Sequence, residues 1–351
     1  MPLRRCLIVI LIAALTVFTA ACSGKRDAGE SDASTNIEYE EDVAQQEVEI
    51  PEPPKAKNPL TGTDMDMEYE NLRPFAVMIE NEYNARPQSG LNKAGVVYEI
   101  LAEGGITRFL AIFLGENLDE IGPVRSARPY FLDYAMEYDS IYVHYGASPQ
   151  GYIDLKQLKL DAIDGIYDDV TFWRDKSRKA PHNAYTSTEN LLNAIDRRGF
   201  RKDTKLIAWK FNSEDSFKGD FELKDFELDY FNKYTVRYIY DQDQKVYERY
   251  INGKAHTDRQ TDESIFVKNI IVCFADTKVI DDVGRLSVKT TASGEGYYIS
   301  NGYCTKIKWQ KDGRGQPTKY TYQDGSELAF NPGNTWIQIL PQWGKFRYEE
   351  S

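Results

Sequence analysis

Val96–Leu114 reads VVYEILAEGGITRFLAIFL, and this stretch decides the fold class. Two almost continuously apolar runs, residues 96–101 and 108–114, lie on either side of a Gly-Gly pair. Apolar runs of this length that do not alternate with polar residues are typical of strands covered on both faces of a sheet. The stretch therefore predicts two buried strands.

The residues around this stretch add strands and helices in alternation. Further short apolar strands are expected at Phe75–Ile79 and Ile141–Tyr145. Ser126–Tyr138 and Ser187–Ile195 each begin with a serine that can cap a helix and continue with helical spacing. Interleaved strands and helices favour an α/β layered domain with a mixed sheet, predicted here over residues 59–212.

The pattern of apolar and polar residues changes after about residue 213. Residues 234–240 and 245–251 alternate between apolar and polar side chains around a polar turn, which is the pattern of a β-hairpin. Short strand candidates punctuated by glycines continue to residue 340. The predicted fold class is an α/β N-terminal domain with a mixed sheet followed by a β-rich C-terminal domain, sandwich-like or barrel-like, over residues 223–349.

The first residues predict secretion and a lipid anchor. Residues 1–21 have two arginines, a short apolar run and small residues, as a signal peptide has. Cys22 follows directly, where a bacterial lipoprotein carries its diacyl group, although Thr19 departs from the usual leucine. The alternative is an ordinary cleaved signal with a cysteine nearby. The lipid interpretation predicts an extracytoplasmic protein attached to the cell membrane through Cys22.

Residues 22–58 predict a flexible acidic tether. Residues 23–58 contain ten acids and four bases, a net charge of −6, and have no hydrophobic period. Prolines at 51, 53 and 54 stiffen its end. The acidity argues against binding anionic lipid along the tether.

Composition and missing motifs exclude several function classes. The net charge of −12 makes nucleic-acid binding unlikely to be the function, because phosphate neutralisation needs a positive surface. Three histidines without metal-ligand spacing predict no metal site, and nucleotide-binding loops are missing, so no cofactor is expected. Cys273 and Cys304 lie in strand candidates; two buried thiols are the favoured interpretation and one disulfide is the alternative.

One string predicts an anion-binding loop. Arg125, Ser126 and Arg128 lie beside a Gly-Pro turn at the start of the expected helix, so guanidinium groups and free amides can converge on a phosphate or carboxylate. Arg86 and Arg108 are further candidate ligand-binding residues. The alternative is that these arginines only form ion pairs with nearby acids, at little net gain in stability.

Two other strings carry candidate catalytic groups. His144 and Ser148 leave an expected strand together, where active sites of α/β sheets often lie. His182 lies on a loop beside Asn183, a candidate ligand-binding residue, and a neutral imidazole there can act as a general base. The structural alternatives are a satisfied histidine at a strand edge and a simple turn.

Several strings together resemble a known family, the YerB-type lipoproteins, which are built on a domain of unknown function. In the first half these strings are Arg86–Leu91, Glu103–Arg108, Gly122–Arg128 and Ala180–Asn183. In the second half Tyr247–Tyr250, Lys268–Ile271 and Asn331–Ile337 are similar to that family's separate C-terminal domain. The resemblance implies a bacterial surface lipoprotein with these two domains, and it implies no activity.

Two functional hypotheses remain. The first is a binding protein of the cell envelope, whose N-terminal cleft takes an anionic or cell-wall ligand or a partner protein through its arginines. The second is an envelope hydrolase or transferase. In it His144 or His182 is the base, Ser148 or water is the nucleophile, and Arg125 with Arg128 clamps the developing charge. The first is preferred because no base with an orienting partner can be read from the spacing, and whether the protein is an enzyme stays open.

Overall fold

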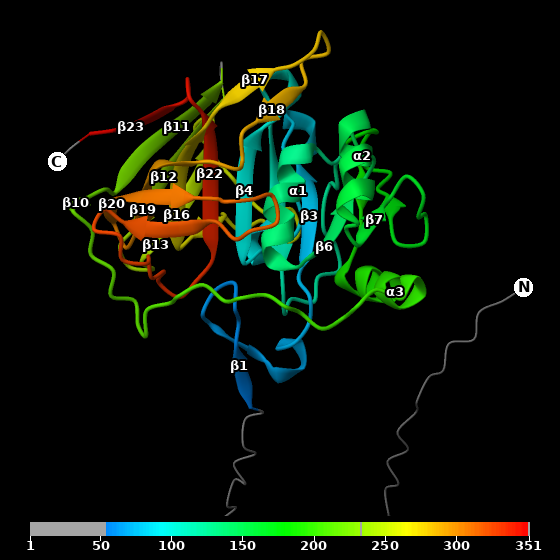
Figure 1. Cartoon of the computed structure of the whole chain (residues 1–351), viewed down its shortest axis with the longest axis horizontal. Helices are drawn as coiled ribbons and strands as arrows, with labels where there is room; N and C mark the ends of the chain where they lie inside the picture. The colour runs from blue at the N-terminus through cyan, green and yellow to red at the C-terminus, as the bar shows by residue number, and fades with distance from the viewer. Residues whose placement is uncertain (1–53, 232–233, 350–351) are drawn as a thin grey trace, which may run out of the picture. The chain divides into compact units, whose positions relative to one another are not determined.

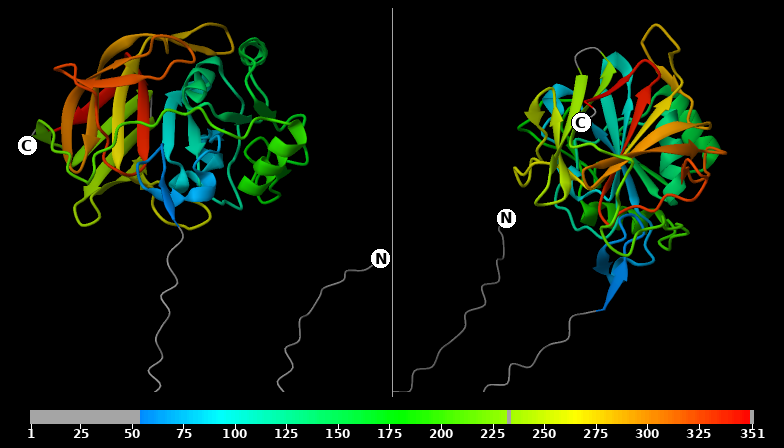
Figure 2. Two further views of the ribbon diagram at one scale, coloured as in Figure 1. Left: turned by 60° about the horizontal axis from the view of Figure 1, so that its bottom comes forward. Right: turned by 90° about the vertical axis from the view of Figure 1, so that its left-hand side faces the viewer.

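The structure is a computed structural model that describes residues 54–231 and 234–349. The predicted signal peptide, Cys22 and most of the tether lie outside the described residues. The main feature of the described part is one mixed, twisted sheet of eleven strands (Figures 1 and 2). The N-terminal half supplies β3 (Phe75–Glu80), β4 (Val96–Leu101), β5 (Thr107–Phe113), β6 (Ile141–His144) and β7 (Ala162–Asp164). The C-terminal half supplies β10 (Phe221–Glu222), β16 (Asn269–Ala275), β19 (Ser293–Ser300), β20 (Tyr303–Gln310), β21 (Lys319–Tyr322) and β22 (Thr335–Pro341).

The strand order is β10-β20-β19-β16-β22-β4-β5-β3-β6-β7, with β21 paired to β20. The two halves meet where β22 pairs in parallel with β4, so that Trp336 lies beside Val97. Strands β16, β22, β4, β3, β6 and β7 run in one direction, because each neighbouring pair among them is parallel and β5 is antiparallel to both β4 and β3. Their carboxyl ends therefore share one edge, called here the carboxyl edge.

The buried strands follow the predicted apolar runs. Every residue of β3, β4 and β5 is buried, which is why these strands lack the alternation of a half-exposed sheet. The predicted second-half strands are present, with ends that differ by at most four residues.

Three α-helices pack on the N-terminal half (Figure 1). They are α1 (Pro129–Ala135), α2 (Pro149–Leu158) and α3 (Thr188–Arg198). Ser187 caps α3 by accepting a hydrogen bond from the amide of Asn190, as predicted. The predicted cap Ser126 is wrong: its hydroxyl donates to the carbonyl of Tyr145. The N-cap position is held by Arg128, two residues later, and α1 begins at Pro129, because proline favours the first helical position. The sequence analysis predicts no helix over residues 149–158, where Ser148 is the N-cap and Pro149 the first residue of α2.

A second, six-stranded antiparallel sheet belongs to the C-terminal half. Its strands are β11 (Asp225–Phe231), β12 (Tyr234–Asp241), β13 (Val246–Ile251), β14 (Lys254–Ala255), β15 (Phe266–Val267) and β23 (Lys345–Tyr348). In β11, Phe226, Leu228 and Tyr230 are buried and alternate with more exposed polar residues, as one covered face requires. The predicted fold class is confirmed: a mixed sheet with helices in the first half and a β-rich second half.

Short ribbons complete the fold. They are β1 (Lys55–Lys57) with β2 (Asp64–Asp66), β8 (Trp173–Arg174) with β9 (Ala184–Tyr185), and β17 (Thr277–Val279) with β18 (Leu286–Val288). The single-turn 3₁₀ helices are η1 (Met67–Tyr69), η2 (Tyr83–Ala85), η3 (Leu91–Lys93), η4 (Glu103–Gly105) and η5 (Met136–Tyr138). The β17–β18 hairpin follows β16 and so lies at the carboxyl edge. The β1–β2 ribbon lies at the other end of the sheet, where Thr61 accepts a hydrogen bond from Gly333, just before β22 (Figures 1 and 2).

The apolar core is continuous across both halves. Strand β22 lies between β16 and β4, so second-half residues are built into the sheet begun by the first half. The domain boundaries at 59–212 and 223–349 stay a prediction. Cys273 and Cys304 are both buried free thiols, in agreement with the favoured interpretation. Among the helices of the described residues, none has the length and apolarity to cross a bilayer.

Candidate functional site

A cleft of about 540 Å³ opens at the carboxyl edge of the parallel strands. Such edges are where open α/β sheets place their ligands, because loops with different side chains converge there. The charged and polar lining side chains come from the ends of β3 and β4, the start of β5, the loop before α1, the start of α2, the 175–183 loop and the β17–β18 hairpin. They are Glu80, Asn81, Glu82, Glu103, Thr107, Arg108, Arg125, Arg128, Ser148, His182 and Arg285.

Two of the predicted arginines share one carboxylate in this cleft. Arg128 donates from Nε and Nη2 to the two oxygens of Glu103, and Arg108 Nη2 lies 3.3 Å from Glu103 Oε2. Burial raises the pKa of the Glu103 carboxyl, but the hydrogen bond from Arg128 and the charges of both arginines outweigh it, so the pKa is lowered. Burial and the charge of Arg128 lower the pKa of Arg108 to about 10, which leaves the guanidinium protonated at neutral pH.

A second charged cluster in the cleft consists of Glu80, Arg125 and His182. Arg125 Nε lies 2.9 Å from Glu80 Oε1, and His182 Nδ1 lies 3.0 Å from Glu80 Oε2. Neither contact has hydrogen-bond geometry, so Glu80 Oε2, Arg125 Nε and His182 Nδ1 are buried polar atoms without a hydrogen-bond partner in the described residues. Buried polar groups are normally hydrogen-bonded, so these three atoms make the cluster a candidate for contact with a ligand.

The loop that carries Arg125 is held as an additional strand-like segment beside β3. The amide of Arg125 donates to the carbonyl of Met78, and that of Glu80 donates to the carbonyl of Pro123. These bonds place Arg125 next to the last residue of β3, so a charge pair forms between segments 45 residues apart.

The arginines and carboxylates of the cleft nearly balance in charge. Arg108, Arg125, Arg128 and Arg285 line it together with Glu80, Glu82 and Glu103, and Arg285 is paired with Asp281. The terminal nitrogens of Arg125 make no hydrogen bond to any described residue, and its side chain is 26% exposed. Guanidinium donors in this state suit a carboxylate or phosphate oxygen.

The two candidate groups on the β6–α2 connection have different surroundings. Ser148 lines the cleft and caps α2 by accepting a hydrogen bond from the amide of Gly151, so its own hydroxyl proton is available to donate. His144 is buried outside the cleft lining, and its Nδ1 lies 2.8 Å from the carbonyl of Gly146. Burial lowers the pKa of His144, although Asp164 opposes the shift.

Three further candidates lie around the cleft and do not line it. Arg86 donates to the backbone and side-chain oxygens of Asn81, which does line the cleft. Ser126 holds the strand-like loop to the end of β6. Asn183 bonds to Arg174 and to two backbone carbonyls of its own loop, as a turn-stabilising residue does.

Sequence reasoning missed several cleft residues. Glu80, Asn81 and Glu82 directly follow an apolar strand, and that position was a usable signal for residues at a strand end. Val283 and Arg285 come from the second half, and no local pattern places them beside the N-terminal cleft. No group of His, Cys, Asp and Glu side chains within 54–231 and 234–349 is arranged to hold a metal ion.

Two family models match this chain. The model described as the N-terminal domain of a protein of unknown function, DUF3048, matches residues 60–201, and the model of its C-terminal domain matches residues 226–337. The chain belongs to the DUF3048 family. The resemblance drawn from the sequence strings is therefore confirmed.

A relative and a solved structure agree with this assignment. The chain is 38% identical over 292 residues to a Bacillus subtilis (strain 168) protein named "Putative lipoprotein YerB", covering 82% of this chain and 87% of that one. The crystal structure of the YerB protein from Bacillus subtilis is similar with a TM-score of 0.76 and 35% identity, covering 84% of this chain and all of the other.

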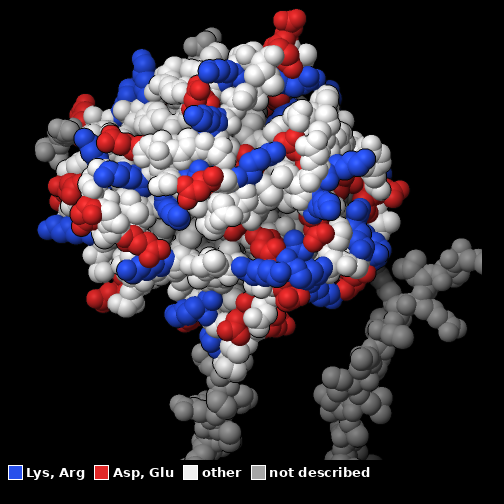
Figure 3. Space-filling view, viewed as in Figure 1, with Lys and Arg blue, Asp and Glu red and all other residues white. Residues whose placement is uncertain are grey.

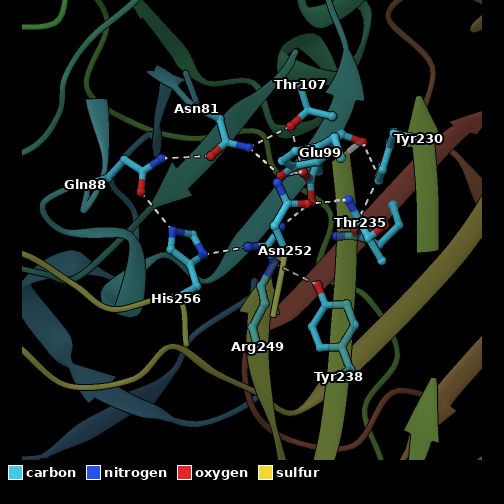
Figure 4. Close-up of polar contacts among 12 residues, drawn as sticks. Asn81, Gln88, Glu99, Thr107, Tyr230, Thr235, Tyr238, Arg249, Asn252 and His256 are labelled. Carbon is cyan, nitrogen blue, oxygen red and sulfur yellow. Dashed lines mark hydrogen bonds and ion pairs between the residues drawn. The ribbon is translucent and has the colours of Figure 1, made fainter. Parts of the chain in front are cut away.

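In this DUF3048 protein the cleft floor continues into a buried polar network that joins the two halves (Figure 4). Asn81 Nδ2 donates to Thr107, whose hydroxyl donates to Glu99. Arg249 from β13 donates to the other oxygen of Glu99 at 2.6 Å, and both side chains are fully buried. Arg249 also contacts His256, so the second half of the DUF3048 chain supports the floor of a cleft lined mainly by the first.

The outer surface differs from the cleft in its charge pattern. On the face seen in Figure 3, Lys and Arg alternate with Asp and Glu, without an extended area of one sign. Surfaces of mixed charge do not steer ligands over long distances. The charge pattern of this face therefore does not by itself indicate a charged partner.

Proposed function

We propose that this chain is a lipoprotein of the cell envelope, and that a diacyl group on Cys22 attaches it to the outer side of the cell membrane. We also propose that its carboxyl-edge cleft binds an anionic ligand. The signal peptide pattern of residues 1–21 and the name of the Bacillus subtilis relative support the anchor. Two acyl chains are enough for stable attachment, whereas one chain holds a protein only marginally.

The observation that carries the binding proposal is the unsatisfied Glu80–Arg125–His182 cluster. Its buried atoms approach one another at 2.9 and 3.0 Å without forming hydrogen bonds, so a ligand that supplies well-directed hydrogen bonds to them would be stabilised there. An anionic oxygen close to Arg125 gives the guanidinium the hydrogen bonds that it lacks. Arg108 and Arg128 add charge from the other side of the lining, and the hydroxyl of Ser148 adds one donor.

The ligand chemistry supported by this lining is a carboxylate or phosphate on a larger molecule, such as a cell-wall fragment or a partner protein. A cleft of about 540 Å³ holds more than a single inorganic ion. The glutamates around it disfavour a densely charged polyanion.

Binding of the full-length protein to purified peptidoglycan and to citrate tests this function. Arg125→Gln combined with Arg128→Gln should weaken binding of both at least tenfold, because two charge-assisted contacts are lost. Arg347→Gln removes one exposed charge far from the cleft and serves as the matched control. Unchanged binding in the double variant would exclude the cleft as the binding site.

A second candidate function, an envelope hydrolase or transferase, is favoured by one contact. The Glu80 carboxylate lies 3.0 Å from Nδ1 of His182, and a change in the angle between the two side chains would give the hydrogen bond by which a carboxylate orients a catalytic imidazole. In this mechanism Nε2 of His182 takes the proton from an attacking water or from Ser148, and Arg125 with Arg128 stabilises the developing oxyanion. His144 lies outside the cleft lining, so His182 is the base proposed here.

Release of soluble fragments from purified peptidoglycan, followed by mass spectrometry, tests the enzymatic candidate. We expect His182→Gln and Glu80→Gln to abolish release, and His144→Gln to leave it intact. Release that persists in His182→Gln, or no release by the unmodified protein, would remove this candidate while leaving the binding function untouched.

A further inference from the structure

Exposed apolar side chains border the cleft on the β17–β18 hairpin. Val279, Ile280 and Val283 are 58–70% exposed, and Val283 itself lines the cleft together with Arg285. These three residues are called the hairpin rim. In Figure 1 the hairpin projects beyond the ends of the neighbouring strands. Leu286 and Val288 of β18 are buried in the core, whereas the three rim residues are exposed.

A second apolar group adjoins the cleft at the start of α2. It consists of Tyr152, Ile153, Ile166 and Tyr167, which are 37–78% exposed and are called the α2 rim. The Tyr152 hydroxyl donates to Asp164, two residues before Ile166. The side chain of Ile166 packs near Gly146, and the next residues of that connection, Ala147 and Ser148, line the cleft.

The two rims lie beside the cleft, and this position indicates an interaction surface. Single exposed apolar residues are normal on protein surfaces, but grouped ones beside a polar cleft mark interaction sites. Arginine and tyrosine next to apolar side chains are also the residue types that carry most of the energy in protein interfaces. A small anion would fill the cleft and leave both rims exposed.

The charges at the rims narrow the type of partner. Asp281 and Asp282 lie on the hairpin between Ile280 and Val283, and Asp168 and Asp169 follow Tyr167. Asp281 is paired with Arg285 and Asp168 with Arg198, so Asp282 and Asp169 are the acids without an ion pair among the described residues, and they repel an anionic lipid surface and a polyanion. Arg125, whose terminal nitrogens make no hydrogen bond to a described residue, is the place for one negative group.

We infer that the cleft and both rims together bind a polypeptide segment of a partner protein that has one or two carboxylates flanked by apolar side chains. This inference rests on the anion-binding function proposed above and names the class of its ligand. The carboxylate contacts Arg125, and the flanking apolar side chains cover the hairpin rim and the α2 rim. Burial of the rims on binding removes apolar surface from water, which adds affinity that a free anion cannot obtain.

Random heptapeptides displayed on phage and selected against the full-length protein test this inference. We expect enriched peptides to contain one or two Asp or Glu residues between apolar residues. Enrichment of polybasic, polyanionic or purely polar peptides, or no enrichment over an empty support, would overturn the inference.

The strongest enriched peptide, made with a fluorescent label, then probes the rims by anisotropy. Val283→Ser combined with Tyr167→Ser should weaken peptide binding about tenfold and leave citrate binding unchanged, whereas Arg125→Gln should weaken both. Ile207→Ser is the matched control, since Ile207 is 77% exposed and does not line the cleft. All these positions are exposed or partly exposed, and an unchanged melting temperature shows that each variant is folded.

The outcomes separate the two proposals. Citrate binding that depends on Arg125, without peptide enrichment or without any effect of the rim variant, refutes the polypeptide ligand and keeps the anion site. Failure of both probes to respond to Arg125→Gln refutes both proposals. Binding of the protein to phosphatidylglycerol vesicles that the rim variant reduces would assign the rims to a membrane surface and also overturn the inference.

Discussion

Two polar clusters of this protein each contain a glutamate, an arginine and a histidine. They differ in burial and in whether these side chains are hydrogen-bonded. In the buried network, Glu99, Arg249 and His256 are fully enclosed and every charged group is hydrogen-bonded (Figure 4). In the cleft, Glu80 and Arg125 meet without hydrogen-bond geometry, and the guanidinium reaches solvent. The residue types are therefore the same in both clusters, and what differs is whether their charged groups are hydrogen-bonded.

The buried network illustrates how a charge pair is kept away from water. Glu99 accepts hydrogen bonds from Thr107 and Tyr234 in addition to Arg249. The guanidinium of Arg249 lies over the ring of Trp336, with 4.6 Å to the ring centroid. These contacts compensate for desolvation only as a complete set, which makes the network sensitive to loss of one member.

Arg249→Met should therefore have the largest effect on stability. The Glu99 carboxylate would remain buried without its countercharge, and we expect the free energy of unfolding to fall by about 3–5 kcal/mol. Chemical denaturation with urea measures this change. The matched control is the double variant with Glu99→Gln, which should regain part of the loss, and a loss below about 1 kcal/mol would show that the network does not hold the halves together.

Lowering the pH should decrease the free energy of unfolding through the histidine of the buried network. Burial and the charges of Arg249 and Arg86 hold the pKa of His256 well below its ordinary value. Near pH 6.5 this histidine therefore binds a proton in the unfolded chain but not in the folded chain. Its contribution to the free energy of unfolding is fully present above pH 6.5 and is lost as the pH falls below that value. One such proton changes the free energy of unfolding by about 1 kcal/mol per pH unit.

Urea denaturation between pH 7.5 and 5 measures this slope in the unmodified protein and in His256→Gln. The glutamine cannot be protonated, so the slope should be smaller in the variant. His144 has its pKa lowered by burial as well and contributes in the same direction, so some slope should remain. Equal slopes in the two proteins would contradict the assignment to His256.

Arg125→Met in the cleft should cost much less than Arg249→Met. The ion pair to Glu80 lacks hydrogen-bond geometry, solvent reaches the guanidinium, and His182 stays close to Glu80. We expect a change of less than about 1 kcal/mol in the free energy of unfolding, together with loss of ligand binding. A loss comparable to that of Arg249→Met would mean that the cleft cluster is structural and would remove the contrast.

Arg347→Gln should have the smallest effect. Arg347 lies on β23, is 50% exposed and pairs with Glu227 and Asp229 on β11. Exposed ion pairs contribute between zero and about 1 kcal/mol, because solvent and salt screen them. The melting temperature at low and high salt measures this effect, and a large change would show that surface pairs of this sheet matter more than expected.

The sequence by itself determined the elements whose signals are local. Buried strands such as Val96–Leu101 are predicted by their continuous run of apolar residues. Ser187 predicts the start of α3, because its side chain caps a backbone amide only three residues away. Sequence strings also led to the correct family. Five of the predicted site residues line one cleft: Arg108, Arg125, Arg128, Ser148 and His182. Arg108 and Ser148 lie at or just beyond strand ends of the shared edge, whereas tertiary packing brings the loops that carry the other three to it.

Only the tertiary structure decided how distant segments combine. The parallel pairing of β22 with β4 joins residues about 240 positions apart, and it brings the second half of the chain into the central sheet. The same long-range packing encloses Arg249 against Glu99, leaves Arg125 and Glu80 imperfectly paired, and brings Val283 to the cleft wall. Hydrogen-bond satisfaction and burial depend on every segment that surrounds a side chain, so no local pattern contains them.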